Sequence, residues 1–261
     1  MQIKNVFKNS LFARSFSLAK SNPSKIGLIV LFDISFLVSF YYVLPILARY
    51  FASNIAVSET ASFLIIFNIF SLLHLFLILF VYSFFKYCVL DSIKSMFAKA
   101  DSSFNRLWQF YLLNVILLLP AYILFSAVIG GVKEAYRPYA LIVLGTPVSL
   151  FLYALINLSH SFFYQGSSIK ESIKRSLKIT FTKLKVYRET ILVIIIGALV
   201  LGLLFFGIGK IISIIASRNY MLYLNIYGYF KQTSIIALDL IFYLIILMNR
   251  ISFYAIAKES T

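Results

Sequence analysis

The sequence predicts an all-α integral membrane protein with six transmembrane helices, and composition is the first reason. Of the 261 residues, 61% are hydrophobic and 13% are charged, whereas an ordinary soluble domain has about 25% charged residues. A soluble protein of this length could not bury so much apolar surface in one core. The same composition excludes a disordered chain. The single cysteine, Cys88, excludes a disulfide-stapled secreted domain.

Six apolar stretches provide the second reason, because a hydrocarbon core about 30 Å thick needs about 20 helical residues. They cover residues 26–48, 62–84, 107–132, 138–163, 190–217 and 233–254. The polar segments between them are short, so residues 1–261 are expected to form a single polytopic membrane domain. Asn22 followed by Pro23 is typical of a helix start and indicates where the first span begins. The first 25 residues lack a signal-peptide cleavage motif, and we expect them to be retained.

The distribution of Lys and Arg predicts the orientation of the spans. The net charge is +15, and 18 of the 24 Lys and Arg residues fall on one side when the loops alternate. Basic residues gather in cytoplasmic loops, so we expect a plasma-membrane protein with both termini in the cytoplasm. In a soluble protein this charge would suggest nucleic acid. Here the basic residues lie between spans, so the predicted partners are membrane lipids with anionic headgroups, and not nucleic acid.

An internal threefold repeat is indicated, with units at 1–85, 86–164 and 165–257. The motifs Ser92-Ile93-Lys94 and Ser172-Ile173-Lys174 lie 80 residues apart, and each opens a polar segment that leads into a span. The second spans of the three units end in the similar motifs YSFF, HSFF and ISFY. A fixed period with matching ends predicts three copies of an amphipathic interfacial helix followed by a transmembrane hairpin. Chance similarity among apolar segments is the alternative.

The connector between spans 4 and 5 is predicted to be an amphipathic helix over residues 168–185. Ser168 and Glu171 form a capping-box pattern at its start. One face carries the apolar residues Ile169, Ile173, Leu177, Phe181 and Leu184, and the other carries the basic residues Lys170, Lys174, Arg175, Lys178 and Lys185. This pattern fits a helix in the inner membrane interface, or one packed on the cytoplasmic side of the protein itself. A similar stripe over residues 89–100 follows a possible cap at Asp91.

The segment from Ser172 to Thr180, SIKRSLKIT, runs directly toward a span and resembles a signature of six-helix membrane proteins. It is similar to the membrane domain fused to some glycerophosphodiester phosphodiesterases and to its stand-alone bacterial and archaeal relatives. The resemblance implies a six-helix bundle with cytoplasmic amphipathic connectors. It implies no activity for this chain, because the phosphodiesterase chemistry of those proteins belongs to a separate soluble domain.

Ionisable residues within the spans are few, and such residues are costly in a bilayer. Asp33 in span 1 and His74 in span 2 lie at similar depths, so a hydrogen-bonded pair of these two side chains is geometrically possible. This pair would be a proton- or cation-sensitive site, or a structural interhelical bond of about 0.6–2 kcal/mol. Asn114 and Asn157 are expected to bridge helices. His160, near the inner end of span 4, is expected to reach the interface.

The remaining patterns bear on packing and chemistry. Span 5 carries Ala198, Gly202, Gly209 and Ser213 at four-residue spacing within two pairs, which favours close helix packing. Catalytic, cofactor-binding and metal-binding motifs are missing from the sequence. We therefore expect a non-enzymatic scaffold or partner-binding module that needs no cofactor. The alternative is a small-solute or lipid transporter with a cavity between the repeats.

Overall fold

The computed structural model describes residues 10–54, 61–98, 104–182, 184–216 and 220–260. All secondary structure in these segments is helical. The α-helices are α2 (Leu11–Ser21), α3 (Pro23–Val38), α4 (Leu44–Asn54), α5 (Ala61–Phe97), α6 (Leu107–Gly130), α7 (Arg137–Ala140), α8 (Thr146–Tyr164), α9 (Ile169–Thr182), α10 (Leu184–Ala216) and α11 (Tyr220–Glu259).

Six helical segments of the described chain are long and apolar enough to cross a membrane, which confirms the predicted number of spans. They are Pro23–Arg49, Asn68–Phe97, Phe104–Ala127, Glu134–Tyr164, Ile191–Ile214 and Leu224–Glu259. The chain is therefore a multi-pass membrane protein. The second and sixth segments extend beyond their predicted ends, and this extension changes where several polar residues lie.

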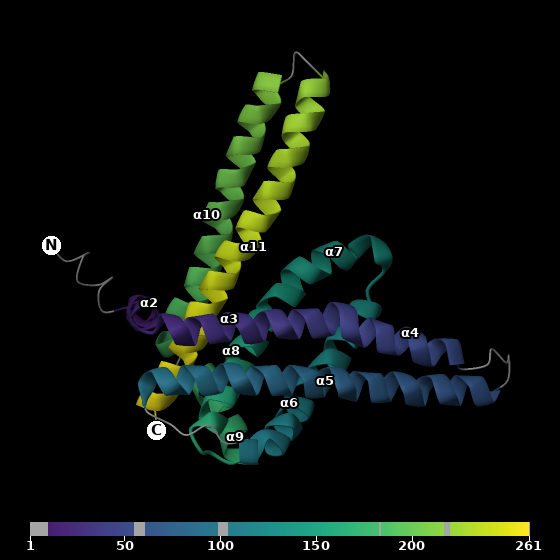
Figure 1. Cartoon of the computed structure of the whole chain (residues 1–261), viewed down its shortest axis with the longest axis vertical. Helices are drawn as coiled ribbons and strands as arrows, with labels where there is room; N and C mark the ends of the chain where they lie inside the picture. The colour runs from purple at the N-terminus through teal and green to yellow at the C-terminus, as the bar shows by residue number, and fades with distance from the viewer. Residues whose placement is uncertain (1–9, 55–60, 99–103, 183, 217–219, 261) are drawn as a thin grey trace.

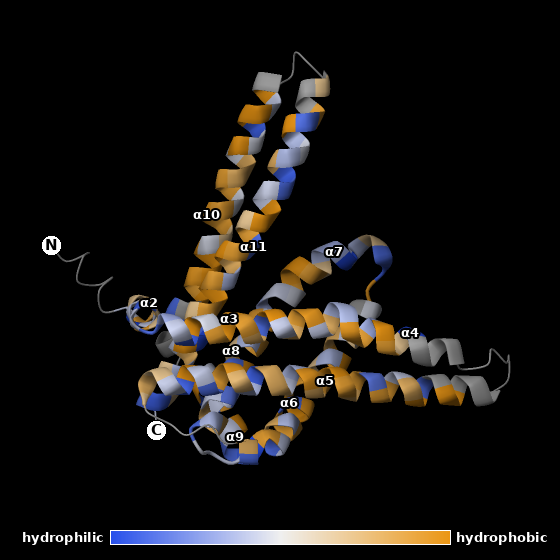
Figure 2. Ribbon diagram, in the orientation of Figure 1, coloured by the Kyte–Doolittle hydropathy of each residue, from blue (hydrophilic) through white to orange (hydrophobic). Residues whose placement is uncertain are grey.

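The six spans form three helical hairpins that diverge from a common end of the molecule, which we name the base (Figure 1). The hairpins are α3–α4 with α5, α6 with α7–α8, and α10 with α11. Helices α2 and α9 lie at the base, as do both described ends of the chain. Hydrophobic residues cover most of α10 (Figure 2). Large apolar side chains on the diverging arms are exposed, as a surface that faces lipid requires.

The core of the molecule lies at the base, where one end of each hairpin meets the others. Phe110, Phe162, Phe163 and Phe253 are fully buried there. One apolar cluster joins α2, α3, α5, α6, α8 and α11, and a second joins α8, α9 and α11. The base therefore holds the three hairpins together, while their far halves make fewer contacts with one another.

Two spans contain a π-helical segment just before a proline. Ser39–Val43 precedes Pro45, and Leu141–Gly145 precedes Pro147. A proline ring clashes with the carbonyl group four residues earlier and offers no N–H group. The wider π-helical turn accommodates both effects without ending the helix.

The two amphipathic connectors predicted between spans, at residues 168–185 and 89–100, differ in the structure. Helix α9 is separate from α8, as predicted, and residue 183, between α9 and α10, lies outside the described residues. The predicted connector at 89–100 is wrong, because α5 continues without a break to Phe97. Residues 61–97 contain no glycine or proline to end the helix. Its last three turns are buried on several sides, so Asp91 is an interior residue of α5 and not a cap.

Candidate functional site

The candidate site is a set of polar side chains buried between the hairpins near the base. Its first member is Asp33 in α3. The Asp33 Oδ2 atom accepts hydrogen bonds from Arg250 Nη1 at 2.6 Å and from Tyr243 Oη at 2.8 Å. Both partners lie in α11. The side chains of Asp33 and Arg250 are less than one-fifth exposed, so the ion pair lies inside the protein.

The predicted Asp33–His74 pair is therefore wrong. Within the described chain, His74 stacks on Phe70 of its own helix, and no hydrogen bond joins it to Asp33. The physical reason is charge, because Arg250 offers a full positive charge and a strong charge-assisted bond. The distance of each residue from the end of its helix could have identified Arg250 as the partner of Asp33. Asp33 lies ten residues after the start of α3 and Arg250 nine before the end of α11, each about 14–15 Å from the base.

A second group joins α5, α6 and α8. The Asn114 amide donates to Ser83 Oγ at 2.9 Å, and its carbonyl oxygen lies 2.7 Å from His160 Nε2. All three side chains are completely buried. Asn114 bridges helices as predicted, but His160 does not reach the interface, because the ring packs against Phe110 and bonds to Asn114. His160 Nδ1 has no hydrogen-bond partner among the described residues.

A third contact joins α5 to α8. The Lys86 ammonium donates to Asn157 Oδ1 at 3.2 Å, and Asn157 Nδ2 donates to the Tyr153 carbonyl oxygen of its own helix. Both side chains are buried. The prediction that Asn157 bridges helices is confirmed. Sequence analysis missed Lys86, because the second span was expected to end at residue 84 and Lys86 was counted as a loop residue.

Together these groups connect α3, α5, α6, α8 and α11 through hydrogen bonds and one ion pair. Most of these polar groups form a hydrogen bond or ion pair with a side chain of a neighbouring helix. Such bonds offset the cost of burying a polar group. These contacts hold neighbouring helices together near the base. In the part of the chain that the structure describes, no group of three or more His, Cys, Asp or Glu side chains could hold a metal ion.

Helix α9 presents the predicted basic residues at the surface of the base. Lys170, Lys174 and Lys178 are exposed. Arg175 donates to Glu171 Oε1 at 2.8 Å, and this hydrogen bond lowers the pKa of the Glu171 carboxyl group. Half of the predicted capping box forms, because Ser168 Oγ accepts from the Glu171 N–H group while the Glu171 side chain turns to Arg175. The side chain of Lys185 lies outside the described residues.

The buried face of α9 is not the predicted apolar stripe. Ser172, Ser176, Ile179 and Thr180 are buried, whereas Phe181 is 70% exposed. Of the other stripe residues, Ile169, Ile173 and Leu177 are partly buried, and the side chain of Leu184 lies outside the described residues. Ser176 Oγ lies 2.6 Å from Ser159 Oγ of α8. Small serine side chains allow the two helices to approach closely, which hydropathy alone does not reveal.

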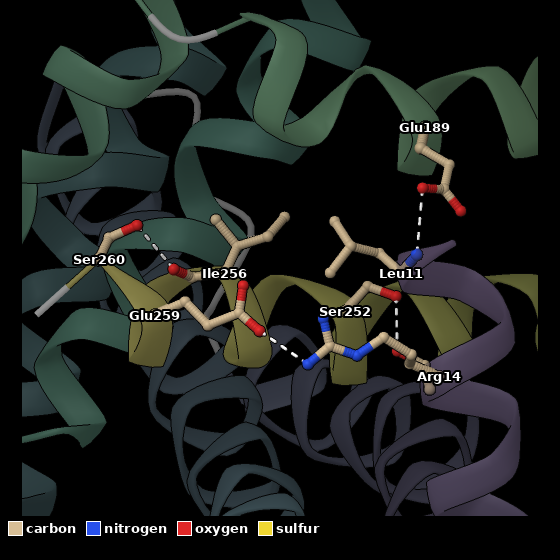
Figure 3. A network of polar contacts seen from close by, with 8 residues as sticks. Leu11, Arg14, Glu189, Ser252, Ile256, Glu259 and Ser260 are labelled. Carbon is tan, nitrogen blue, oxygen red and sulfur yellow. Dashed lines mark hydrogen bonds and ion pairs between the residues drawn. The ribbon is translucent and has the colours of Figure 1, made fainter. Parts of the chain in front are cut away.

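Helix α2 is held against α10 and α11 by four polar contacts. Figure 3 shows those of Leu11, Arg14 and Ser252. The Glu189 carboxylate of α10 accepts from the N–H groups of Leu11 and Phe12, both at 3.1 Å. Arg14 forms a 2.9 Å ion pair with Glu259, and Ser15 Oγ lies 2.8 Å from Ser252 Oγ. These contacts join the start of the described chain to its end.

The small residues of α10 divide into two groups. A Cβ atom placed on Gly209 would lie 3.4 Å from the Phe230 ring of α11, so this residue permits close packing of the hairpin. Ser213 is partly buried, whereas Ala198 is exposed and Gly202 faces open space. The prediction of close packing within the chain therefore fails for Ala198 and Gly202. Gly197 takes this role instead, because a Cβ atom there would lie 2.8 Å from Ile245 Cδ1.

Comparison with known proteins adds no assignment, because no family model, curated protein or solved structure matches the chain. The resemblance to the membrane domain of glycerophosphodiester phosphodiesterases stays a prediction.

Proposed function

We propose that the chain is a non-enzymatic scaffold or partner-binding module of the membrane. The observation that carries this proposal is that the buried polar groups bond to one another. Asn114 and His160 are 0% exposed and bonded to each other, and Asp33 is occupied by Arg250 and Tyr243. Groups engaged in this way hold helices together and are not free to bind a polar substrate. The surfaces of the base and of the arms remain for a partner.

The base faces the cytoplasm of a plasma-membrane protein in this proposal, with both termini on that side. The support is the charge bias, because 18 of the 24 Lys and Arg residues belong to the segments assigned to that side. Both described ends of the chain also lie at the base (Figure 1), which suits an even number of spans.

Anionic headgroups are the proposed lipid partners of the base. Lys170, Lys174 and Lys178 are exposed on α9, and each basic residue near an anionic surface contributes about 1 kcal/mol of attraction. Lys174 and Lys178 line a cavity of about 320 Å³ together with Ser260. Arg175 lies in the same cavity but is engaged by Glu171, so the lysines carry most of the available positive charge.

The internal repeat also remains a proposal, supported by the way the short helices pack. Helix α9, in the third unit, packs on α8 of the second unit through Ser176 and Ser159. Helix α2, in the first unit, packs on α11 of the third unit through Ser15 and Ser252. Each short helix thus lies against the second span of the preceding unit, counted in a ring. The second unit lacks a separate short helix, because α5 continues into that position.

Transport of a small solute or a lipid is the second candidate function. One observation favours it, which is an apolar groove of about 390 Å³ between α5, α6 and α8. The groove suits an apolar substrate and not an ionic one. It lies between helices of the first and second units, where the transport hypothesis expects a cavity.

Crosslinking and reconstitution distinguish the two functions. We expect crosslinking in native membranes to place the chain in a complex with a second protein. We also expect liposomes that contain the purified chain to exchange fluorescent phospholipid between leaflets no faster than protein-free liposomes. Faster exchange that is lost in an Ala121→Phe variant, which fills the groove, would contradict the scaffold proposal and favour transport.

The headgroup proposal is tested by hydrogen exchange in nanodiscs. Residues 169–182 should exchange more slowly in phosphatidylglycerol than in phosphatidylcholine, and added salt should reduce this difference. The double variant Lys174→Gln/Lys178→Gln should abolish it. Lys133→Gln, far from α9 in the chain, is the control and should leave it unchanged. Equal exchange in both lipids would show that the lysines do not bind headgroups.

A further inference from the structure

The groove between α5, α6 and α8 is lined mainly by apolar side chains, and contacts in the structure mark both of its ends. Its volume is about 390 Å³, within the range of about 300–1,000 Å³ typical of small-molecule sites. Each wall belongs to a different span. The lining residues include Leu75 and Leu79 from α5, Leu118 and Ala121 from α6, and Leu152 and Ile156 from α8.

The end of the groove nearer the base is closed by the buried polar group described above. Leu79, Leu118 and Ile156 each lie one helical turn from Ser83, Asn114 and His160, respectively. Residues four apart share a helix face, and these three polar side chains are bonded to one another. The groove therefore stops above a completely buried layer and does not continue as a channel through the base.

The far end is bounded by Phe125. A Cβ atom placed on Gly145 would lie 3.5 Å from the Phe125 ring, so a glycine at this position lets the ring lie against α8 and its preceding turn. Between these two ends the groove runs along α6 from Leu118 to Phe125 and along α8 from Ser149 to Ile156. Seven helical steps correspond to a length of about 10 Å.

The chemistry of the walls excludes water as the occupant. Only Tyr122 and Ser149 among the lining residues carry polar side-chain atoms. An internal water needs two to four polar partners, and apolar cavities stay dry. An empty groove would forfeit the dispersion contacts of its lining atoms. Because all three walls belong to candidate membrane spans, hydrocarbon is the material that reaches the groove.

We propose that this groove binds one acyl chain of a membrane phospholipid, held between α5, α6 and α8. The bound chain fills the space that the diverging hairpins leave on the far side of the Ser83, Asn114 and His160 group. This proposal does not depend on the scaffold function, because a resident lipid can stabilise a scaffold as well as occupy a transporter.

The test is photo-crosslinking with a phosphatidylcholine that carries a diazirine within its acyl chain, in nanodiscs, with the labelled peptides mapped by mass spectrometry. We expect several-fold more label on the groove residues of α5, α6 and α8 than on the lipid-facing surface of α10. Ala121→Phe should reduce the groove label at least fivefold. Ala127→Phe, the same change at an exposed position of the same helix, is the matched control and should not.

Ser149→Phe fills the groove from the opposite wall and replaces Ala121→Phe if that variant does not fold. Equal labelling of the groove and of α10 would overturn the proposal, and so would unchanged labelling in the filled variants. Labelling by a free fatty-acid probe but not by the phospholipid probe would overturn the assignment to phospholipid. Crosslinks from groove residues to another polypeptide would show that the occupant is protein.

Discussion

Asp33 in α3 and Arg250 in α11 form a 2.6 Å ion pair although they are 217 positions apart in the chain. The pair joins the first hairpin to the third, and Tyr243 adds a 2.8 Å hydrogen bond to the same carboxylate oxygen. Both charges are mostly buried within spans. Each charge therefore depends on the other for its stability in the membrane.

Asp33→Asn should destabilise the protein strongly, because it leaves the Arg250 guanidinium buried without an acid. A loss on the order of 3 kcal/mol of unfolding free energy is expected. Adding Arg250→Gln should recover part of this loss, since the uncompensated charge is then removed. Unfolding by a denaturing detergent, followed by circular dichroism, measures both values.

Glu134→Gln is the control for this experiment, because Glu134 is an exposed acid at the first residue of a span. It should change the unfolding free energy by less than about 0.5 kcal/mol. If Asp33→Asn were equally silent, or if the double variant lost the sum of the two single losses, the ion pair would not be coupled as the structure indicates.

The six spans could be predicted from sequence because hydropathy depends on local composition. The polar contacts between hairpins could not, because they join residues that are far apart in the chain. Asp33 was identified correctly as a polar residue within a span. Its partner, however, was sought in the second helix of the same hairpin. Arg250 was assigned to the aqueous end, since the last span was expected to end at residue 254, whereas α11 continues to Glu259.

The prediction of where α5 ends was wrong for a different reason. Lys86 and Asp91 suggested a polar connector, although residues 61–97 contain no glycine or proline that would end the helix. The structure extends the helix because Tyr87, Val89, Leu90 and Ile93 pack into the apolar core of the base, and Asp91 accepts a hydrogen bond from Tyr164. Tertiary packing thus decides the helix end.

Asn114→Leu should destabilise the contact between α5, α6 and α8. It removes the donor to Ser83 and the partner of His160 Nε2, and both groups remain buried. The expected loss is about 1–3 kcal/mol of unfolding free energy.

The same unfolding assay measures this loss. Tyr122→Phe removes a hydroxyl group from the same helix at a position that is 62% exposed, and it should be close to neutral. A neutral Asn114→Leu would mean that the three side chains do not hold the helices together.

Glu189→Ala should loosen α2. The carboxylate accepts from the first two N–H groups of this helix, which have no partner within the helix itself. Loss of such a cap costs about 0.5–2 kcal/mol, so amide exchange over Leu11–Ser21 should accelerate about 2- to 30-fold. Glu134→Ala, at an exposed position outside the base, should not change this exchange. Acceleration in α10 but not in α2 would contradict the capping role.

Ser176→Leu should displace α9 from α8. Ser176 is 0% exposed, and its hydroxyl oxygen lies 2.6 Å from that of Ser159, so there is no room for a larger side chain. Overpacking of this kind costs about 1–3 kcal/mol, whereas Ser176→Ala, which removes only the hydrogen bond, should cost about 1 kcal/mol. Hydrogen exchange over residues 169–182 measures the displacement. In phosphatidylcholine, which carries no net charge to attract the lysines, Lys178→Leu places the same side chain on the exposed face of the same helix and should leave exchange nearly unchanged. If the two leucine variants behaved alike, the serine face would not be what attaches α9 to the base, and the apolar stripe with Ile173 and Leu177 would have to hold it.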